Sequence, residues 1–386
     1  MNLLQNSSVL IISHYYTRTI SGGGPAQEVR DFLLKKVNKI VYIEHPFPYA
    51  DDKRSSMRIY QNGKLISQYF TPIRCYHEII FYIADIWISA KYILQSHISF
   101  TACIALDSLN TVSVMPFRLL GKISKLIFYS IDYVPVRFES KPLNFLYHLV
   151  DKVACMYSDA LWVLSPKMTE MRKKYGITRI APQVMLPMGA NLSRIHPLPI
   201  SKINRHQLVF AGHLLEKQGL QLMIKALPYI INRITDVQLL IIGKGEYENT
   251  LKALVKSLQL AKYVQFLGFI KNHDDLEKIL CASAIGLAPY TPTPDSYTYF
   301  TDPGKPKLYL GCGLPVVITN VPPIAETIQF HHAGFMVEYQ IKNISDSIIK
   351  LLTNEKLYST YRRNALKLAK KFDTNYLIEE AIKNTL

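Results

Sequence analysis

The segment Asp302-Pro303-Gly304-Lys305 holds the residues best suited to chemistry in this sequence. It follows a loop rich in Thr, Tyr and Pro and precedes a predicted short helix and a predicted strand, Pro315–Ile318. An ammonium group at the start of a helix adds a full charge to the partial positive charge of the helix end. We therefore expect Lys305 and the start of this helix to bind a diphosphate, and Asp302 and Gly304 to belong to the same ligand-binding site. The alternative is a lysine that contacts only water.

Three loops that contain glycine follow predicted strands: Ser21–Ala26, Gly212–Gly219 and Gly243–Gly245. Glycine lets backbone N–H groups approach a ligand closely, and a helix N-terminus favours an anion. No Gly-Lys-Ser/Thr follows the first loop, which excludes a P-loop. Glu248 replaces the third glycine of a dinucleotide fingerprint, which disfavours a nicotinamide dehydrogenase. The candidate binding residues of these loops are Gly23, Gly24, Gly212, His213, Lys217 and Gly243.

Short apolar runs alternate with helix-length periodic segments through both halves of the chain, a pattern typical of parallel sheets covered on both faces. The predicted fold class is α/β, with two doubly wound Rossmann-like domains facing a central cleft. We expect an N-terminal domain over 1–190, a C-terminal domain over 191–370, and a helix in 371–386 that packs back on the first domain. The domain boundary is predicted at Pro187–Arg205. The predicted strands are Val9–Ser13, Ile40–Glu44, Ala102–Leu106, Leu126–Ser130, Ala160–Leu164, Gln207–Ala211, Gln238–Ile242, Val264–Leu267, Ile285–Ala288 and Pro315–Ile318.

Composition narrows the function classes. The 386 residues include 45 Lys and Arg against 29 Asp and Glu, a net charge of +16 that suits an anionic ligand, a nucleic acid or an anionic membrane surface. The five cysteines lie far apart without a CxxC pair, which argues against a disulfide framework and a structural zinc site. The N-terminus lacks the basic region of a signal peptide, and no segment reaches the roughly 20 apolar residues of a membrane span. A cytoplasmic protein is expected.

The order and spacing of these segments resemble a family-four glycosyltransferase (group 1 glycosyl transferase) of GT-B fold, and the resemblance covers nearly the whole chain. It implies transfer of a sugar from a nucleotide-sugar donor to an acceptor, with retention at the anomeric carbon. The C-terminal domain is then expected to hold a UDP- or GDP-sugar, and the N-terminal domain the acceptor. Phe269, Ile270 and Leu308 join the donor-binding residues on this reading. The segments that carry the resemblance are the early glycine loop, Met188–Asn191, Gly212–Gly219, Gly243–Gly245, Val264–Gly268 and Lys305–Pro315.

The sequence also departs from the family pattern. The Gly212 loop of the family carries an arginine and a lysine where this chain has His213 and Gln218. A pair of glutamates near the Lys305 helix is replaced by Phe300 and Leu308. Nearby carboxylates that can substitute belong to Asp295 and Asp302. We expect a divergent active enzyme, and the alternative is a catalytically inactive GT-B scaffold or binding protein.

The expected catalytic residues are Lys305, Asp132 and His213. Lys305 and His213 would neutralise the charge that develops on the leaving phosphate, and Asp132, after a predicted strand, would contact the sugar. The alternative for Asp132 is a cap of the following turn. No Asp-x-Asp triplet occurs in the sequence, so we expect a metal-independent reaction without a cofactor. His14 and Asp107 also end predicted strands, and each is as well explained by local hydrogen bonds.

Two further classes are weighed against the transferase. A sugar-nucleotide epimerase of related fold would need carboxylate pairs that we do not find. A nucleic-acid-binding protein would need a basic repeat or an RNA-binding motif, and the sequence has neither.

The expected acceptor is a glycan or a lipid-linked molecule. The predicted helix Tyr76–Gln95 is apolar on more than one face, and Arg118, Lys122, Lys125 and the run Arg172–Lys174 are basic. Peripheral attachment to the anionic inner face of a membrane is therefore expected, with a buried helix as the alternative.

Overall fold

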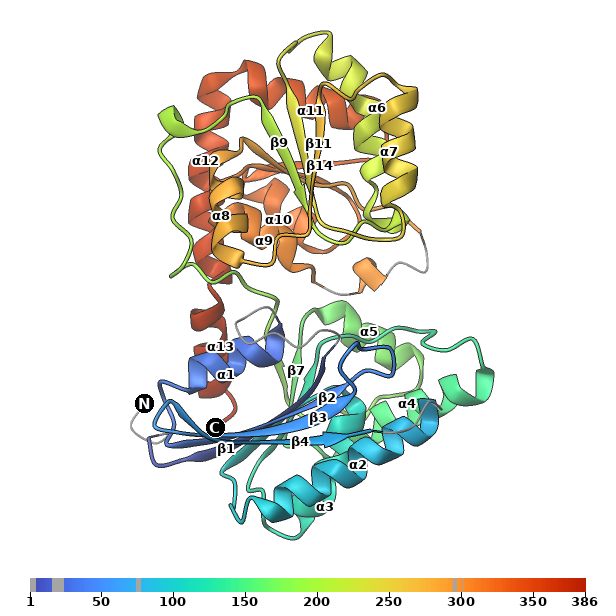
Figure 1. Ribbon diagram of the computed structural model, residues 1–386, viewed down its shortest axis with the longest axis vertical. Coiled ribbons are helices and arrows are strands. Elements are labelled where there is room, and N and C mark those ends of the chain that lie inside the picture. The colour runs from blue at the N-terminus through green and yellow to red at the C-terminus, as the bar shows by residue number, and fades with distance from the viewer. Residues whose placement is uncertain (1–4, 16–23, 74–77, 294–296, 301) are drawn as a thin grey trace. The chain divides into compact units, whose positions relative to one another are not determined.

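The computed structural model describes residues 5–15, 24–73, 78–293, 297–300 and 302–386. The chain divides into two compact units (Figure 1). Unit 1 comprises Met1–Leu186 together with Ile378–Leu386, and unit 2 comprises Pro187–Leu377. Each unit is built around one sheet, and each is described separately below.

Unit 1 has an eight-stranded sheet of order β4-β3-β2-β1-β5-β6-β7-β8. The strands pair in parallel except for β2 with β3 and β3 with β4, which pair antiparallel. The five strands predicted in this half are confirmed, but the sheet is mixed rather than wholly parallel. The strands are β1 (Ser8–Tyr15), β2 (Lys39–Pro46), β3 (Arg54–Gln61), β4 (Lys64–Pro72), β5 (Ala102–Leu106), β6 (Leu126–Ser130), β7 (Ala160–Val163) and β8 (Gln183–Met185).

The β3–β4 hairpin was not predicted, although the sequence carries a signal for it. Its turn is Asn62-Gly63, with φ of 50° and 77°, and Asn-Gly is a favoured two-residue hairpin turn because both positions need a positive φ. The hairpin was missed because its strands mix polar and apolar residues instead of forming a continuous apolar run. It makes β4 one of the two edge strands of the sheet, with β8 at the other edge.

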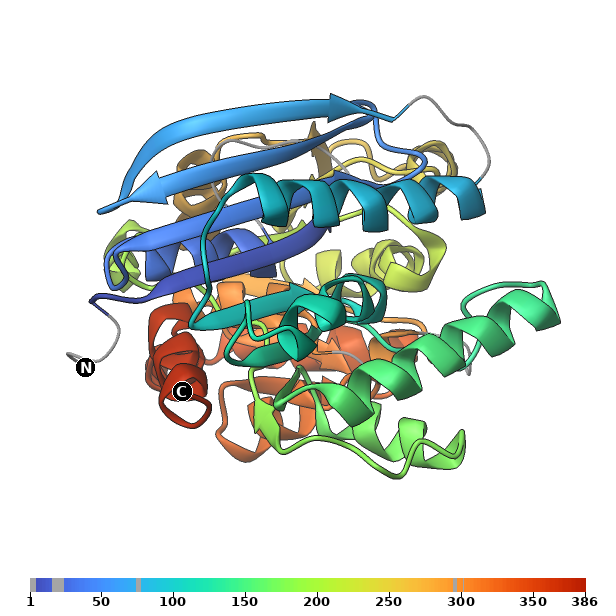
Figure 2. The ribbon, with the colours of Figure 1, turned by 90° about the horizontal axis from the view of Figure 1, so that it is seen from below.

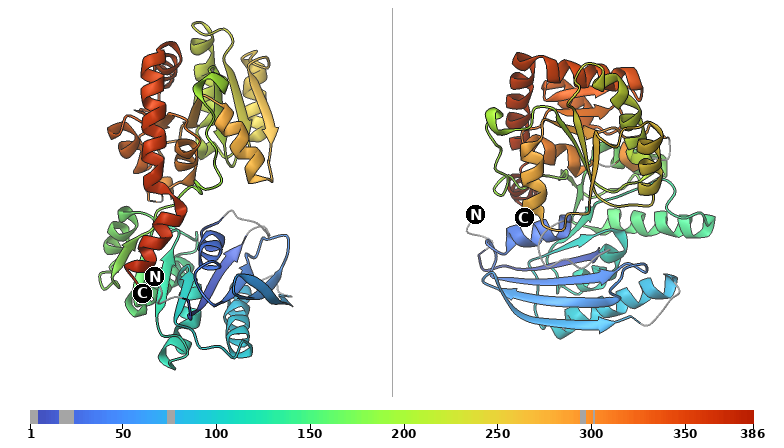
Figure 3. Two further views of the ribbon diagram at one scale, coloured as in Figure 1. Left: turned by 90° about the vertical axis from the view of Figure 1, so that its left-hand side faces the viewer. Right: turned by 45° about the horizontal axis from the view of Figure 1, so that its top comes forward.

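Helices cover both faces of the unit 1 sheet (Figure 3). The connection from β1 to β2 and the connection from β4 to β5 run in opposite directions along the sheet, so right-handed crossovers place α1 and α2 on opposite faces. Near the C-terminus, the Trp162 indole donates to Thr385 Oγ1 at 2.9 Å. The helices are α1 (Pro25–Leu33), α2 (Glu78–Gln95), α3 (Ser108–Leu119), α4 (Lys141–Tyr157) and α5 (Pro166–Lys174), together with the part of α13 (Thr374–Lys383) from Ile378 onward.

Unit 2 has a six-stranded parallel sheet of order β11-β10-β9-β12-β13-β14. The five strands predicted here are confirmed, and β14 is additional. The strands are β9 (Gln207–Ala211), β10 (Gln238–Ile242), β11 (Val264–Gly268), β12 (Ile285–Ala288), β13 (Val316–Thr319) and β14 (Gly334–Val337). The helices are α6 (Leu220–Ile231), α7 (Glu248–Ser257), α8 (His273–Ala282), α9 (Gly304–Gly311), α10 (Ile324–Phe330), α11 (Ile341–Thr353) and α12 (Glu355–Ala369).

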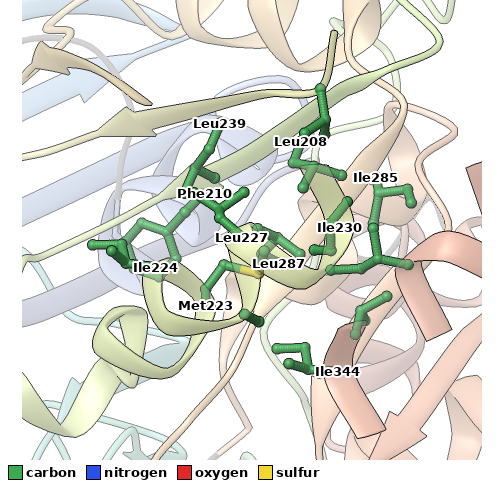
Figure 4. Close-up of a cluster of buried hydrophobic side chains, with 14 of the residues drawn as sticks. Leu208, Phe210, Met223, Ile224, Leu227, Ile230, Leu239, Ile285, Leu287 and Ile344 are labelled. Carbon is green, nitrogen blue, oxygen red and sulfur yellow. The ribbon is translucent and has the colours of Figure 1, made fainter. Parts of the chain in front are cut away.

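The strands of unit 2 are held by apolar packing on both faces. On one face, Met223, Leu227 and Ile230 of α6 lie against Leu208 and Leu287 of the sheet (Figure 4). Burial of this continuous apolar cluster removes aliphatic surface from water, and it fixes the strands whose carboxyl ends carry the candidate site.

Candidate functional site

The loops that follow β9, β10 and β11 are joined by backbone hydrogen bonds at the carboxyl edge of the unit 2 sheet. Gly212 N donates to Ile242 O at 2.9 Å, and Gly243 N donates to Gly268 O at 2.8 Å. Since β9, β10 and β11 are neighbours in the sheet, these bonds hold the predicted loops together as one surface. Ligands of open α/β sheets bind at this edge.

Two glycines allow the close approach of backbone and side chains in this surface. Gly243 has φ of 138°, and a Cβ atom added to it would lie 1.9 Å from Gly212 O. Gly212 has φ of 154°, and a Cβ atom added to it would lie 2.9 Å from Lys305 Nζ. Larger residues at these two positions would displace the neighbouring loop or the lysine.

Lys305 lies in the first turn of α9, and its ammonium group reaches the loop after β9. The Nζ atom lies 4.3 Å from the centroid of the Phe210 ring and 5.1 Å from that of Tyr290, and it donates a hydrogen bond to Gln218 Oε1. One turn later, Tyr309 anchors α9 to the sheet, because its hydroxyl accepts from Ala211 N at 2.8 Å. The helix therefore holds the ammonium group beside Gly212.

Burial lowers the pKa of Lys305 to about 7. The acceptor Gln218 is a neutral amide, which does not replace the lost hydration of a cation as a carboxylate would. Two aromatic faces attract the ammonium group, and no carboxylate of the described residues forms an ion pair with it. This arrangement suits an anionic ligand, because an anion would supply the missing charge.

Asp302 and Lys307 form a buried ion pair just before and inside α9. The side chain of Lys307 is fully buried, and its Nζ contacts Asp302 Oδ2. Burial raises the pKa of the Asp302 carboxyl and lowers that of the Lys307 ammonium, and their contact opposes both shifts. The pair links the residue that precedes Pro303 to the body of α9 and so orders the start of the helix.

Comparisons with known proteins match a segment of unit 2 to a described family. Residues 205–354 match the model of the family described as glycosyl transferases group 1. Over this segment the chain is similar to group 1 glycosyl transferases. Because residues 205–354 lie in unit 2, the matched segment carries the surface that contains Lys305 and Gly212.

Solved structures confirm the predicted GT-B fold over the whole chain. The sucrose-phosphate synthase of Thermosynechococcus elongatus superposes with a TM-score of 0.72 at 15% identity, and 98% of each chain is covered. The Anabaena protein HepE, solved in complex with UDP-glucose, gives a TM-score of 0.68 at 14% identity over 98% of this chain and 99% of that one. At these identities the likeness shows the fold alone.

Sequence similarity to curated relatives is confined to part of the chain. A mannosyltransferase of Corynebacterium glutamicum, described as GDP-mannose-dependent and acting on monoacylated α-(1-6)-phosphatidylinositol monomannoside, is 29% identical over 182 residues. The alignment covers 43% of this chain and 46% of that protein, so the chain spans about half the length of the curated relatives it matches.

The structure brings several of the predicted donor-binding residues to the same edge of unit 2. Gly212 and Lys305 are in contact, and Gly243 lies directly beside Gly212. His213 is exposed, and Phe269 is exposed by 67%. Lys217, Gly304, Leu308 and Ile270 are half-buried, Asp302 is buried against Lys307, and Asp295 lies outside the described residues.

Gln218, Phe210 and Tyr290 form the immediate surroundings of the Lys305 ammonium group, and sequence reasoning did not assign them to the site. Gln218 drew notice only because a lysine is usual at its place. The apolar run of β9 indicates that Phe210 is buried, but no local pattern shows that its ring faces a lysine 95 positions later in the chain.

The predicted site residues of the N-terminal half lie in unit 1. Gly23 lies outside the described residues, and Gly24 directly precedes α1, where its carbonyl accepts from Glu28 N at 3.0 Å. Asp132 follows β6 and is partly exposed, and its carboxylate pairs with Arg137 at 2.7 Å. The Asp132 carboxylate accepts a hydrogen bond from this guanidinium, and its expected contact with the sugar stays a prediction.

His14 and Asp107, noted at the ends of two strands, belong to one partly buried cluster of unit 1. His14 Nδ1 lies 2.8 Å from Asp107 Oδ2, and His14 Nε2 lies 3.1 Å from Asp85 Oδ2. Burial opposes a charge on the imidazole, but the two carboxylates outweigh it and raise the pKa of His14 to about 10. Asp107 has φ of 68°, an uncommon conformation for aspartate that this network holds.

Among the described residues, no group of three or more His, Cys, Asp or Glu side chains is arranged to hold a metal ion. The Lys305 ammonium group lies beside Gly212 at the candidate surface of unit 2.

Proposed function

We propose that this chain is a retaining, metal-independent glycosyltransferase that moves a sugar from a UDP- or GDP-sugar to a glycan or lipid-linked acceptor. The observation that carries the proposal is the Lys305 ammonium group beside Gly212, in a family whose matched segment contains both residues. Similarity to a GDP-mannose-dependent enzyme that acts on a phosphatidylinositol mannoside supports the donor and acceptor classes.

Departure of the nucleoside diphosphate places negative charge on its phosphate oxygens. A fixed positive group lowers the barrier to this step because its attraction grows as the charge develops. Lys305 and the N-terminus of α9 would supply that positive charge, and Gly212 would let the phosphate approach the backbone. The departing phosphate would accept the proton of the acceptor hydroxyl, so the reaction would need no protein nucleophile.

The competing proposal is a GT-B scaffold without activity, which the family's two missing glutamates favour. Phe300 and Leu308 stand at those positions and cannot accept hydrogen bonds from sugar or ribose hydroxyls with their side chains. If the protein is an active enzyme, other groups of the same surface would accept the hydrogen bonds from the sugar and ribose hydroxyls.

Release of nucleoside diphosphate from a panel of UDP- and GDP-sugars separates the two proposals. In Lys305→Ala, the loss of a charge-assisted contact of about 1.5–3 kcal/mol should lower turnover at least about tenfold while the melting temperature hardly changes. Lys278→Ala removes a lysine that is 77% exposed and serves as the matched control. Release by neither protein from any donor would support the scaffold, and equal release by wild type and Lys305→Ala would remove Lys305 from the reaction.

Metal independence has its own test. Donor turnover should survive an excess of EDTA, because the proposed leaving-group charge is met by Lys305 and backbone groups. Loss of turnover with EDTA and recovery with magnesium or manganese would refute this part of the proposal.

A further inference from the structure

Helix α2 of unit 1 presents apolar side chains on the side that faces away from the sheet. Phe81, Ile88 and Tyr92 are buried against the sheet, as expected for a covering helix. On the opposite side, the exposed residues are Ile79, Ile80, Ile83, Trp87 and Leu94, and Trp87 is exposed by 73%. The sequence alternative of a wholly buried helix is therefore wrong, because the outer stripe is exposed in unit 1.

The exposed apolar residues continue onto the neighbouring helices. Helix α2 packs beside α3, and α3 packs beside α4, so the three helices form one layer (Figure 2). The C-terminal end of α3 adds Leu119 and Leu120, which are exposed by 81% and 80%. Helix α4 adds Phe145, Leu146 and Leu149. We call this surface, made by residues 78–95, 108–122 and 141–157, the helical face of unit 1.

The charges on the helical face are mostly positive. Its basic residues are Lys91, Arg118, Lys122, Lys141 and Lys152. Its acidic residues are Glu78, Asp85 and Asp151, and the last two are buried in contacts with His14 and Arg172. Glu78 is therefore the exposed carboxylate of these three segments, all of which the structure describes. A surface with exposed isoleucines, a tryptophan and lysines combines the two features that bind an anionic bilayer.

We propose that the helical face of unit 1 docks on a bilayer surface that contains anionic phospholipid. The inference rests on the proposed transfer to an acceptor, and it specifies that the acceptor is held in a membrane. Among the described residues, no helix is both long and apolar enough to span a bilayer, so the contact would be interfacial. Tryptophan and lysine favour this interfacial depth, where a ring meets acyl chains and an ammonium meets headgroups.

Charge favours a lipid surface over a second copy of the chain. In a symmetric dimer the same patch meets itself, which would bring Lys91, Lys122 and their equivalents toward one another. Anionic headgroups instead neutralise these lysines while the apolar side chains leave water.

The basic residues that can contact lipid headgroups differ from those expected from the sequence. Arg172 is wholly buried against Asp151, and Arg118 pairs with Asp159 at 2.8 Å.

The two tryptophans allow a direct test. Trp162 is fully buried in β7, whereas Trp87 is exposed on the helical face. With Trp162→Phe, the fluorescence reports Trp87 alone. If that variant is unstable, quenching of the wild type by brominated lipid reports the same residue, because lipid would reach Trp87 first. We expect a blue shift on adding phosphatidylcholine vesicles with a rising fraction of phosphatidylglycerol at low salt, and its reversal at high salt.

Matched variants assign the contact to the helical face. Ile83→Asp and the double variant Lys91→Glu/Lys122→Glu should each weaken vesicle binding at least about tenfold. Phe330→Asp, at a phenylalanine of unit 2 that is 79% exposed, and Lys278→Glu should bind as wild type does. All four should release nucleoside diphosphate from a donor normally in lipid-free solution, because they leave the Lys305 surface unchanged.

Each result bears on one proposal. Unchanged Trp87 emission at every lipid composition would overturn membrane docking, while normal donor turnover in the same preparation would leave the transferase intact. A blue shift without lipid that rises with protein concentration, together with a dimer in sedimentation velocity, would assign the helical face to a second copy and would also overturn docking. Docking without any donor turnover would instead reject the proposed function.

Discussion

Titration of Lys305 gives the most direct test of the candidate site. Burial lowers the pKa of its ammonium group to about 7, so the free protein is expected to hold much of this lysine neutral above that pH. A bound diphosphate would place negative oxygens near Nζ and favour the charged form, which raises the pKa again. Binding of nucleoside diphosphate should therefore take up a proton at alkaline pH.

The size of the effect follows from these two pKa values. With a pKa of about 7, only about 3% of Lys305 is protonated at about pH 8.5. If the bound diphosphate restores the ordinary value of about 10.4, binding takes up about one proton at that pH. The dissociation constant should then rise by up to about tenfold for each pH unit between about pH 7.5 and 9.5, since affinity follows the protonated fraction. The terminal phosphate titrates near pH 6, so its own charge is constant over this range.

Isothermal titration calorimetry with UDP and GDP in buffers of different ionisation enthalpy measures the proton uptake directly. Lys305→Arg is the matched control, because its guanidinium stays charged and should give an affinity independent of pH. Lys305→Met should bind weakly at all pH values. A wild-type affinity that is flat from about pH 7.5 to 9.5, with no proton uptake, would refute the reasoning. If Lys305→Met also bound as wild type does, the lysine would not face the diphosphate.

Three further predictions concern residues around the site and in unit 1. Gly212→Ala should weaken nucleotide binding because its Cβ would meet Lys305 Nζ, whereas Gly121→Ala, with φ of 74° and open space around it, controls for backbone strain alone. Asp302→Asn should lower the free energy of unfolding by about 3–5 kcal/mol in urea titrations, because it leaves Lys307 buried without its counter-ion, and adding Lys307→Met should recover part of the loss. His14→Gln should lower the free energy of unfolding most below about pH 6.5, and this loss should shrink as pH rises towards 10, because the pKa of His14 in the folded protein is raised to about 10. An equal loss at all pH values would contradict this prediction.

Several features followed from local sequence. Continuous apolar runs such as Gln207–Ala211 and Gln238–Ile242 predicted strands with the bounds the structure has, because a strand buried on both faces needs apolar residues at successive positions. The Asn62-Gly63 turn shows the limit of that rule, since the half-exposed strands beside it lack such a run. The loops after the strands were also located correctly, because Gly212 and Gly243 interrupt the pattern where the chain must turn.

The sequence by itself determined the two-unit α/β fold, the glycine loops and the position of Lys305 at the start of a helix, because these depend on residues close together in the chain. Only the tertiary structure decided what surrounds each charge. Gln218 meets Lys305 across 87 positions, and Asp107 meets His14 across 93, because sheet topology brings the ends of distant strands together. The outward direction of Trp87 was likewise decided by packing, since a helix that is apolar on several sides does not reveal which side the sheet will cover.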